Sequence, residues 1–449
     1  MRRTLDANHS ALRQMSTYPR LGYYAILPLL LCLSLGTGVR AQNPTPAPEQ
    51  DGPIAITNAT IHVGNGTVIE RGTIVFADGR ITAIGASASV PAGTTTIDAA
   101  GKHVYPGLIA LNSQLGLVEI DAVRSTNDQR EVGNLNPNAR ALIAFNTDSQ
   151  IIPTVRSRGV LLAQTTPVGG SISGRSSMVQ LDGWNFEDAV VGADDGVHIN
   201  WPRRSSYNWR TGTLRPNPNY AENVTDLEAF LTEAAAYCQE GRSGDRLLKL
   251  EAMCEAMAAA KNVYLHVYEA RDIQQAVLLM KKAGAKPVIV GGDEAYKVTG
   301  FLKEHGVPVI LGSTQSLPNR QDDAIDQPFR NPALLARAGV LFAMSHGGSW
   351  EQRNLPFIGG QAVGFGLDRE AAITALTLSP AQITGIDKDY GSLETGKSAT
   401  LIIVSGDVLD MRTSDVERAY IDGRDINLDN KQAELARKFR SKYAREQRR

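Results

Sequence analysis

The sequence predicts an α/β fold in which a (β/α)8 barrel is inserted into a small composite β-sandwich domain formed by both ends of the chain. Residues 106–386 alternate short apolar strands with helical segments, which is typical of a parallel sheet with crossover helices. On either side, residues 52–105 and 387–428 contain short strands separated by tight turns. About 280 residues of strand–helix repetition suit an eight-stranded barrel. An open doubly wound sheet is the alternative.

The N-terminal segment, residues 1–41, has the pattern of a signal peptide. Several arginines precede the apolar run "LGYYAILPLLLCLSLGTGV", and "VRA" then ends in a small-x-small cleavage site at Ala41. The apolar run is short for a membrane span and contains Pro28 and Gly36. We therefore expect an exported protein, periplasmic or secreted, with an uncleaved membrane anchor as the weaker alternative. A Pro-rich linker, residues 42–51, follows.

The charge balance argues against a nucleic-acid partner. The 449 residues carry a formal net charge of −1, so no basic excess exists to neutralise phosphates. The chain ends in a charged helix, residues 429–449, whose basic stretch "KFRSKYAREQRR" is typical of a solvated helix end that needs no partner. Export would permit a disulfide. Cys238 and Cys254 lie on consecutive predicted helices, and the sequence leaves open whether they pair or remain two buried thiols.

Individual elements follow from local patterns. "GTIVFADGRITAIG" predicts a hairpin that turns at Asp78–Gly79. In the barrel region, "VLLAQT", "VYLHV", "PVIV", "PVIL" and "LFAM" are typical of buried strands. "ARDIQQAVLLMKKAG" has apolar residues at helical spacing and closes at Gly284. The Gly- and Ser-rich stretch "PVGGSISGRSSMVQLDGW" predicts tight loops between short strands. It could contain an activated serine, but nothing in the sequence selects one.

Two end motifs resemble the amidohydrolase superfamily, specifically its imidazolonepropionase-like group. "IDAAGKHVYPGLIALNSQ" resembles the segment that leads into the family's barrel, and "LTLSPAQITGIDKDYGSLETGKSATLIIVSGD" resembles the segment that leaves it. The resemblance covers essentially the whole mature chain. It implies a TIM-like barrel and a hydrolase that attacks carbon–nitrogen bonds with metal-activated water.

The resemblance also implies where metal ligands should lie. The family's first barrel strand ends in His-x-His, its fifth and often its sixth strand supply further histidines, and its eighth strand supplies an Asp. Here the His-x-His positions fall on Asn112, Ser113 and Gln114, while the fifth-strand histidine matches His266. The sixth-strand position, in "VIVGG", has no histidine, and the eighth-strand Thr-Asp pair falls on "SH", which ends in His346.

These correspondences make His266 and His346 the candidate metal ligands, with His346 also a candidate catalytic base. Asn112 and Gln114 would offer only neutral oxygen ligands, which bind zinc more weakly than imidazole does. The resemblance thus implies either one divalent ion, zinc first, or none. Several acidic and polar residues nearby are better explained as solvated loop acids or turn formers: Glu119, Asp121, Asp148, Asp194, Asp195 and His198.

The leading functional hypothesis is an exported hydrolase of non-peptide or cyclic amide bonds with a degenerate metal site. A second hypothesis is a catalytically inactive barrel that binds a small amide or peptide-like ligand. A third is a non-catalytic subunit that partners an active homologue. Self-association, or a hetero-complex with a related amidohydrolase, would be compatible with each hypothesis.

Overall fold

The computed structural model describes residues 45–208, 210, 213–240, 245–318, 320 and 322–446. The expected signal peptide, residues 1–41, lies outside the described residues, so its cleavage and the export of the protein remain predictions. Among the described residues, no helix is long and apolar enough to cross a bilayer.

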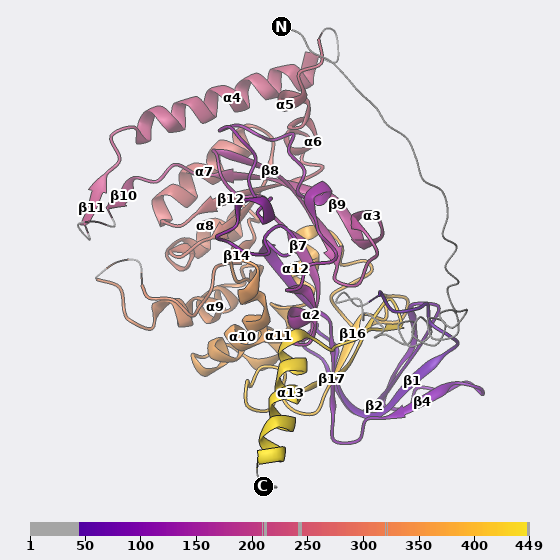
Figure 1. The fold of residues 1–449 in the computed structure, drawn as a ribbon. Coiled ribbons are helices and arrows are strands. Elements are labelled where there is room, and N and C mark those ends of the chain that lie inside the picture. The colour runs from indigo at the N-terminus through magenta and orange to yellow at the C-terminus, as the bar shows by residue number, and fades with distance from the viewer. Residues whose placement is uncertain are drawn as a thin grey trace, which may run out of the picture. The chain divides into compact units, whose positions relative to one another are not determined.

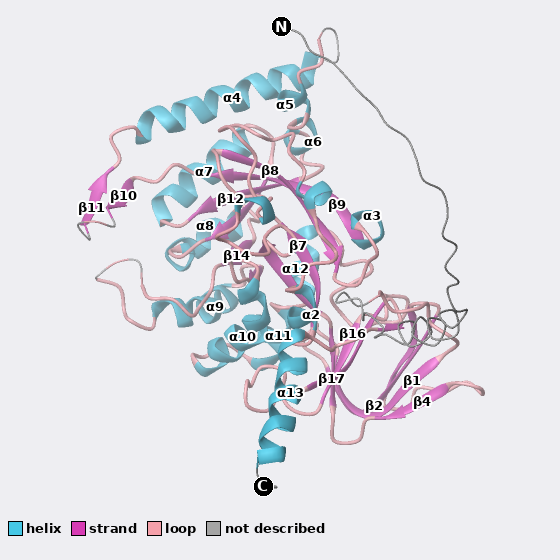
Figure 2. Cartoon of the chain, viewed as in Figure 1, coloured by secondary structure: helices cyan, strands magenta, loops and turns pink. Residues whose placement is uncertain are grey.

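Both ends of the chain contribute strands to one mixed β-sheet, as predicted for the composite domain (Figures 1 and 2). Its strand order is β18-β17-β16-β5-β1-β2-β3, and β4 pairs with β1. The ends join where β16 pairs antiparallel with β5, with Ile402 opposite Tyr105. The strands are β1 Ile54–His62, β2 Val68–Ala77, β3 Arg80–Gly85, β4 Thr95–Asp98, β5 His103–Pro106, β16 Leu401–Val404, β17 Val416–Ile421 and β18 Arg424–Asp425.

The predicted hairpin in this sheet is present. Strands β2 and β3 are antiparallel neighbours, and Asp78 and Gly79 connect them with φ values of 49° and 75°. Two successive positive φ angles match the twist of a two-residue hairpin, and Asp-Gly tolerates them well. The local sequence therefore specifies the register of this edge of the sheet.

The second sheet forms a nearly closed barrel of eight strands, in the order β15-β14-β13-β12-β9-β8-β7-β6. Strand β8 runs antiparallel to β7 and β9, whereas the other neighbouring pairs are parallel. The strands are β6 Leu108–Ser113, β7 Val160–Thr165, β8 Ile172–Gln180, β9 Val190–Asn200, β12 Asn262–Val267, β13 Lys286–Gly291, β14 Val309–Leu311 and β15 Phe342–Met344.

Strand β8 corrects the prediction of tight loops for the Gly- and Ser-rich stretch. The segment from Ile172 to Gln180 is a nine-residue, mostly buried strand. Its neighbours β7 and β9 satisfy its backbone groups, and its small residues allow close packing. A Cβ added at Gly174 would lie 2.8 Å from the carbonyl oxygen of Ala139. Tertiary pairing thus overrides the turn preference of the composition.

An irregular segment closes the gap between the barrel's edge strands β6 and β15. The backbone N–H of Ile109 in β6 donates to the carbonyl of Leu376 at 2.9 Å. The N–H of Met344 in β15 donates to the carbonyl of Ala375 at 3.1 Å. Residues 375 and 376 therefore take the place of direct strand pairing.

Helices pack around the barrel sheet, and several of them connect successive strands along the chain (Figure 2). In α7 the buried residues Ile273, Ala276, Val277 and Met280 recur at helical spacing, which explains why this segment is an amphipathic helix. The α-helices are α2 Ile152–Arg156, α3 Phe186–Ala189, α4 Tyr220–Glu240, α5 Leu248–Glu251, α6 Cys254–Met257, α7 Ala270–Lys282, α8 Thr299–Glu304, α9 Gln327–Ala338, α10 Leu355–Gly364, α11 Arg369–Thr374, α12 Leu378–Thr384 and α13 Lys431–Glu446.

Shorter elements complete the described chain. A two-stranded hairpin, β10 and β11, precedes α4, and four 3-10 helices lie in the connecting segments. Their bounds are β10 Ser205–Asn208, β11 Thr213–Pro216, η1 Arg124–Thr126, η2 Ala141–Ala144, η3 Ala295–Val298 and η4 Trp350–Asn354. The structure also decides the cysteine question, because Cys238 in α4 and Cys254 in α6 form a disulfide.

Candidate functional site

The residues predicted for the metal site lie at the carboxyl ends of barrel strands, where barrel active sites are built. Asn112 and Ser113 are the last two residues of β6, the first barrel strand. His266 is the penultimate residue of β12, the fifth barrel strand in chain order. His346 follows β15, the eighth, by two residues.

Asn112 and Gln114, at the end of the first strand, make hydrogen bonds that hold this part of the barrel together. The Oε1 of Gln114 accepts the backbone N–H of Gly348 at 2.7 Å, and the backbone N–H of Gln114 donates to the carbonyl of Gly348 at 3.2 Å. The backbone N–H of Asn112, a residue with a positive φ of 52°, donates to the Oε1 of Gln164 at 3.1 Å. Gln114 therefore ties the end of the first strand directly to the loop that follows the eighth.

His346 is not hydrogen-bonded to His266 in the described part of the chain. Its half-buried ring has its Nδ1 3.1 Å from the carbonyl oxygen of Gly347, whereas His266 bonds His198. Of the two acids that follow the first barrel strand in the sequence, Asp121 is exposed, while Glu119 accepts the backbone N–H of Gln150 at 3.2 Å. The structure thus does not bring the predicted set together.

Instead, His266 belongs to a chain of hydrogen bonds that runs into the barrel interior. Its Nε2 lies 2.9 Å from the Nδ1 of His198 on the neighbouring strand β9. The Nε2 of His198 lies 2.8 Å from the Oγ of Ser176 in β8, and this hydroxyl donates to the Oδ1 of Asp195 at 2.8 Å. His266 keeps part of its surface exposed, whereas the other three side chains are buried.

Further donors surround the buried carboxylate. The hydroxyl of Tyr264 donates to the Oδ2 of Asp195 at 2.5 Å, and the Nε2 of Gln164 donates to the same oxygen at 2.7 Å. Asn262 in turn donates from its Nδ2 to the Tyr264 hydroxyl at 3.1 Å. Because buried polar groups are costly unless they are paired, this degree of pairing explains how an apolar barrel accommodates the carboxylate.

The bonding pattern fixes the positions of the ring protons. Since the Ser176 hydroxyl donates to Asp195, its oxygen accepts from the Nε2–H of His198. A neutral His198 then presents a lone pair at Nδ1, which accepts from the Nε2–H of His266. A neutral His266 therefore carries its free lone pair on Nδ1, for which the described residues provide no hydrogen-bond partner.

Burial controls the protonation of this chain. It lowers the pKa of His266 to about 4. Burial, together with the neighbouring His266, lowers the pKa of His198 well below its ordinary value. Burial also raises the pKa of Asp195, and hydrogen bonds from Tyr264, Ser176 and Gln164 oppose that rise. Both rings are consequently neutral at pH 7.

Sequence reasoning missed most of this network. Asp195 and His198 were expected in a turn, but both lie in strand β9, where neighbouring strands bury them. A usable pattern exists in β12, where Asn262, Tyr264 and His266 alternate with apolar residues, so the three polar side chains share one face. Only the fold could select Ser176 among the serines of its stretch.

The residues present do not fit the divalent metal that the fold family implies. No group of three or more His, Cys, Asp or Glu side chains in the described part of the chain is arranged to hold a metal ion. The Nε2 of His266 is occupied by His198, and Gln114 is occupied by Gly348. Zinc sites use three protein ligands or more.

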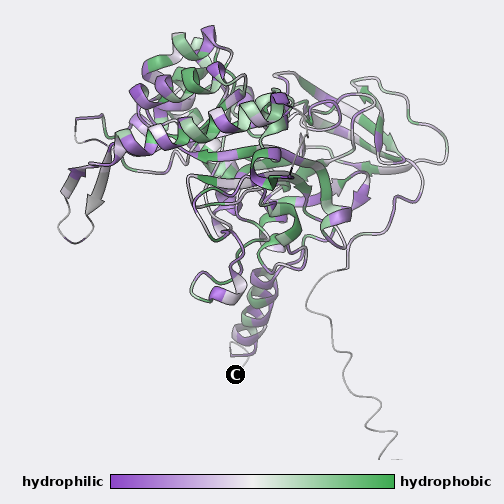
Figure 3. Ribbon diagram, turned by 90° about the horizontal axis from the view of Figure 1, so that it is seen from above, coloured by the Kyte–Doolittle hydropathy of each residue, from purple (hydrophilic) through white to green (hydrophobic). Residues whose placement is uncertain are grey.

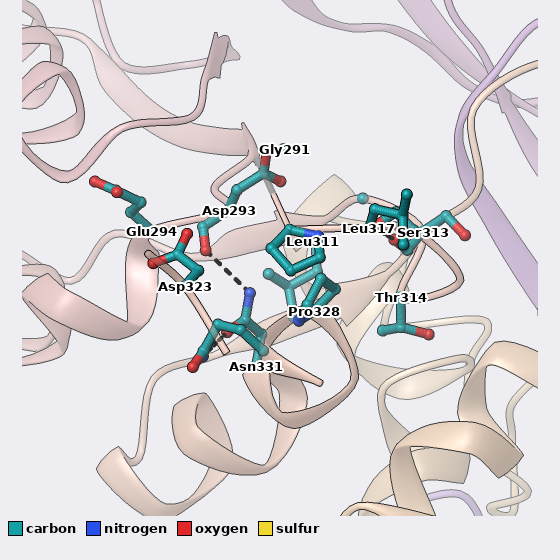
Figure 4. A pocket seen from close by; sticks show the side chains of 14 residues that line it. Gly291, Asp293, Glu294, Leu311, Ser313, Thr314, Leu317, Asp323, Pro328 and Asn331 are labelled. Atoms are coloured by element: carbon teal, nitrogen blue, oxygen red, sulfur yellow. Dashed lines mark hydrogen bonds between the residues drawn. The ribbon is translucent and has the colours of Figure 1, made fainter. Parts of the chain in front are cut away.

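A cavity of about 200 Å³ opens at the ends of the sixth and seventh barrel strands (Figure 4). Gly291 and Leu311, the last residues of β13 and β14, are among the residues that line it. One side is apolar and the other is acidic, as Figure 4 shows. The apolar residues are Leu311, Leu317, Pro318 and Pro328, and the acidic ones are Asp293, Glu294 and Asp323. His266 is not among the residues that line it.

Comparisons with known proteins agree with this architecture. Residues 232–436 match the sequence profile described as Amidohydrolase family. An imidazolonepropionase from Mesorhizobium japonicum is 24% identical over 375 residues, covering 75% of this chain and 87% of the relative. Adenine deaminase 3 from Rhizobium meliloti is 23% identical over 384 residues, covering 81% of this chain but only 56% of that relative.

A solved structure shows the same fold. An amidohydrolase from Thermotoga maritima MSB8 superposes with a TM-score of 0.73 at 24% sequence identity, and the match covers 83% of this chain and 99% of that one.

Proposed function

The chain belongs to the amidohydrolase superfamily, and we propose that it hydrolyses a carbon–nitrogen bond of a small amide or cyclic amide at the mouth of its barrel, with His266 as the proton acceptor. The single observation that carries this proposal is the hydrogen-bond chain from His266 through His198 and Ser176 to Asp195. It places a partly exposed base at a strand end and connects it to a buried carboxylate. A base oriented by a second group in this way is a general feature of acid–base sites.

This chain of hydrogen bonds can move a proton without leaving a charge on either histidine ring. When Nδ1 of His266 takes a proton from the attacking water, Nε2 of His266 passes its proton to His198. His198 passes its Nε2 proton to Ser176, and Ser176 passes its hydroxyl proton to Asp195. The water oxygen bonds to the amide carbon as the carbon–nitrogen bond breaks, and the reverse transfer returns the proton to the leaving nitrogen.

Relatives support the class of bond. The matched proteins named imidazolonepropionase and adenine deaminase both act on carbon–nitrogen bonds. Members of the superfamily usually use a divalent metal. Because the residues described here do not fit one, the proposed steps rely on the side chains of the chain itself.

The cavity begins at Gly291, which pairs with Val267, the residue after His266, and we propose that it holds the non-reacting part of the substrate. At about 200 Å³ it suits a small ring or a short acyl group rather than an extended peptide. Two of the three carboxylates on its wall, those of Glu294 and Asp323, pair with Lys297 at 2.7 and 3.7 Å, which offsets part of the negative charge. We therefore expect uncharged amides and lactams to be preferred over substrates that carry a free carboxylate.

Turnover of an amide and lactam panel tests the proposal. We expect the parent protein to hydrolyse a member of the panel, and His266→Gln to lower kcat/KM by about 100-fold or more, the usual range for loss of a general base. His346→Gln is the matched control and should change kcat/KM less than about 3-fold, because that ring lies outside the chain of hydrogen bonds. Equal losses in the two variants would overturn the role of His266.

Metal content, measured by elemental analysis, tests the mechanism separately. Activity that persists in metal-free protein and in excess chelator would agree with the proposal. One tightly held ion per chain, with activity lost on its removal, would contradict it.

A second candidate, ligand binding without turnover, is favoured by the Gln114–Gly348 hydrogen bonds. Because of these bonds, Gln114, which stands at a ligand position of the family, has a structural role instead. Under this alternative, lactams would raise the thermal stability of the protein while the whole panel remained intact, and His266→Gln would leave that binding unchanged. Export of the protein is a further proposal, supported by the arginines, apolar run and "VRA" site of residues 1–41.

A further inference from the structure

We propose that the C-terminal helix α13, Lys431–Glu446, binds the surface of a lipid bilayer that carries anionic headgroups. This inference concerns a surface outside the candidate active site and does not rest on the proposed function.

Helix α13 extends away from the barrel and the composite sheet toward the C-terminus, as two views show (Figures 1 and 3). None of its residues is buried, and all except the half-buried Ala433 are exposed. Its attachment lies at its first turns, where Gln432 bonds Thr154 at 2.6 Å and Arg437 pairs with Asp429 at 2.6 Å. The rest of the helix is free to meet another surface.

Three large apolar residues form a stripe along the exposed helix. Leu435, Phe439 and Tyr443 recur at every fourth position, and they are 38%, 47% and 54% exposed. Residues four apart lie on the same side of an α-helix, so these side chains form one continuous line. A leucine and two aromatic rings on one side are the apolar half of an interfacial helix.

Cations flank this stripe. With 3.6 residues per turn, Lys438 and Lys442 fall on one side of Phe439 and Arg440 on the other. Residues 431–446 contain six basic and two acidic side chains, a net charge of +4, whereas the whole chain carries −1. The basic residues are Lys431, Arg437, Lys438, Arg440, Lys442 and Arg445, and the acidic ones are Glu434 and Glu446.

This combination fits an anionic bilayer better than a second copy of the helix. Long basic side chains beside an apolar stripe can place their stems along the acyl boundary and their charges among headgroup phosphates. A coiled-coil seam would alternate spacings of three and four over several heptads, whereas this stripe steps by four and the whole helix has only 16 residues. Two copies would also bring two +4 helices together.

Vesicle co-sedimentation tests the proposal. The chain is mixed with phosphatidylcholine vesicles, or with vesicles of phosphatidylcholine and phosphatidylglycerol at about 7:3. All proteins compared share one N-terminus, so the apolar segment near residues 21–39 contributes equally. We expect partitioning onto the anionic vesicles to exceed that onto neutral ones at least tenfold and to fall as salt is added, since each cation near an anionic surface contributes roughly a fivefold factor.

Two sets of variants connect the binding to the helix. Phe439→Ser with Tyr443→Ser, and separately Lys438→Gln with Arg440→Gln and Lys442→Gln, should each lower the anionic partition coefficient at least tenfold. The matched controls remove exposed groups of the same kind elsewhere, the apolar ones being even more exposed than Phe439 and Tyr443, and should have no effect. They are Trp184→Ser with Met411→Ser, and Arg271→Gln with Lys281→Gln and Lys286→Gln.

Because every substituted side chain is exposed, circular dichroism melts should coincide with those of the parent protein. Binding that the α13 variants leave unchanged, or binding equal on neutral and anionic vesicles, would overturn the proposal. Concentration-dependent dimerisation abolished by Phe439→Ser with Tyr443→Ser, without vesicle binding by the parent, would assign the stripe to a second copy and also overturn it.

Discussion

His198 and His266 lie on neighbouring barrel strands, with the Nδ1 of one ring 2.9 Å from the Nε2 of the other. The bond joins two neutral imidazoles, because burial lowers the pKa of His266 to about 4 and that of His198 well below its ordinary value. Protonating either ring would disturb a hydrogen-bond chain that extends to Asp195. The pair therefore couples the protonation of the site to the stability of the barrel.

This coupling predicts a loss of stability in mild acid. Unfolded histidine titrates near 6.5 and folded His266 near 4, so the unfolded chain binds more protons between these values. The contribution of neutral His266 to the free energy of unfolding is therefore full above pH 6.5 and is lost as the pH falls toward 4. Allowing for the partial exposure of His266, we expect the free energy of unfolding to decrease by about 1 to 2 kcal/mol from pH 7 to pH 5 on its account.

Urea unfolding at pH 8, 7, 6 and 5 measures this effect. His266→Gln removes the titrating ring, so its free energy of unfolding should decrease less than that of the parent over the same pH range. Identical decreases in the two proteins would contradict the assignment of a depressed pKa to His266.

A buried ion cluster predicts a large loss of stability on Asp182→Asn. Asp182 pairs with Arg156 and, at 2.9 Å, with Arg424 of the composite sheet, and all three are almost fully buried. The substitution would leave two buried guanidinium groups without their counter-charge, which typically costs 3–5 kcal/mol, so we expect about that decrease in urea unfolding. The exposed pair of Arg80 with Asp389 provides the control, because Asp389→Asn should cost less than about 1 kcal/mol. Similar losses in the two variants would contradict this reasoning.

Two glycines in helix α10 predict opposite effects of adding one methyl group. A Cβ at Gly360 would lie 2.1 Å from the carbonyl oxygen of Leu409, whereas one at Gly364 would meet no atom within 4 Å. Gly360→Ala should therefore destabilise the protein by about 1 to 3 kcal/mol through overpacking. Gly364→Ala should be neutral or stabilise by up to about 1 kcal/mol, the difference in helix propensity. Equal shifts in melting temperature in the two variants would contradict this prediction and would show that the backbone at Leu409 can move to accommodate the methyl group.

The sequence predicted the architecture because its signals are local. Turn dipeptides such as Asp78–Gly79, apolar strand runs and the helical spacing in α7 each act over a few residues, so the barrel and composite sheet could be predicted from them. The position of His266 on the fifth barrel strand came from the family resemblance. Ser176, Asp195 and His198 could not be found, because they meet only when β8 runs antiparallel between β7 and β9. That reversal depends on long-range pairing of a segment whose composition favours turns.

The disulfide is expected to stabilise the folded protein. Cys238 and Cys254 are 16 residues apart and join α4 to α6, so the bond restricts a loop in the unfolded chain. A loop of this length corresponds to about 3 kcal/mol. We expect Cys238→Ser with Cys254→Ser to lower the free energy of unfolding by about that amount. Dithiothreitol should destabilise the parent similarly and leave the double variant unchanged. A parent protein insensitive to reductant, with two free thiols at these positions by mass spectrometry, would show that the bond does not form.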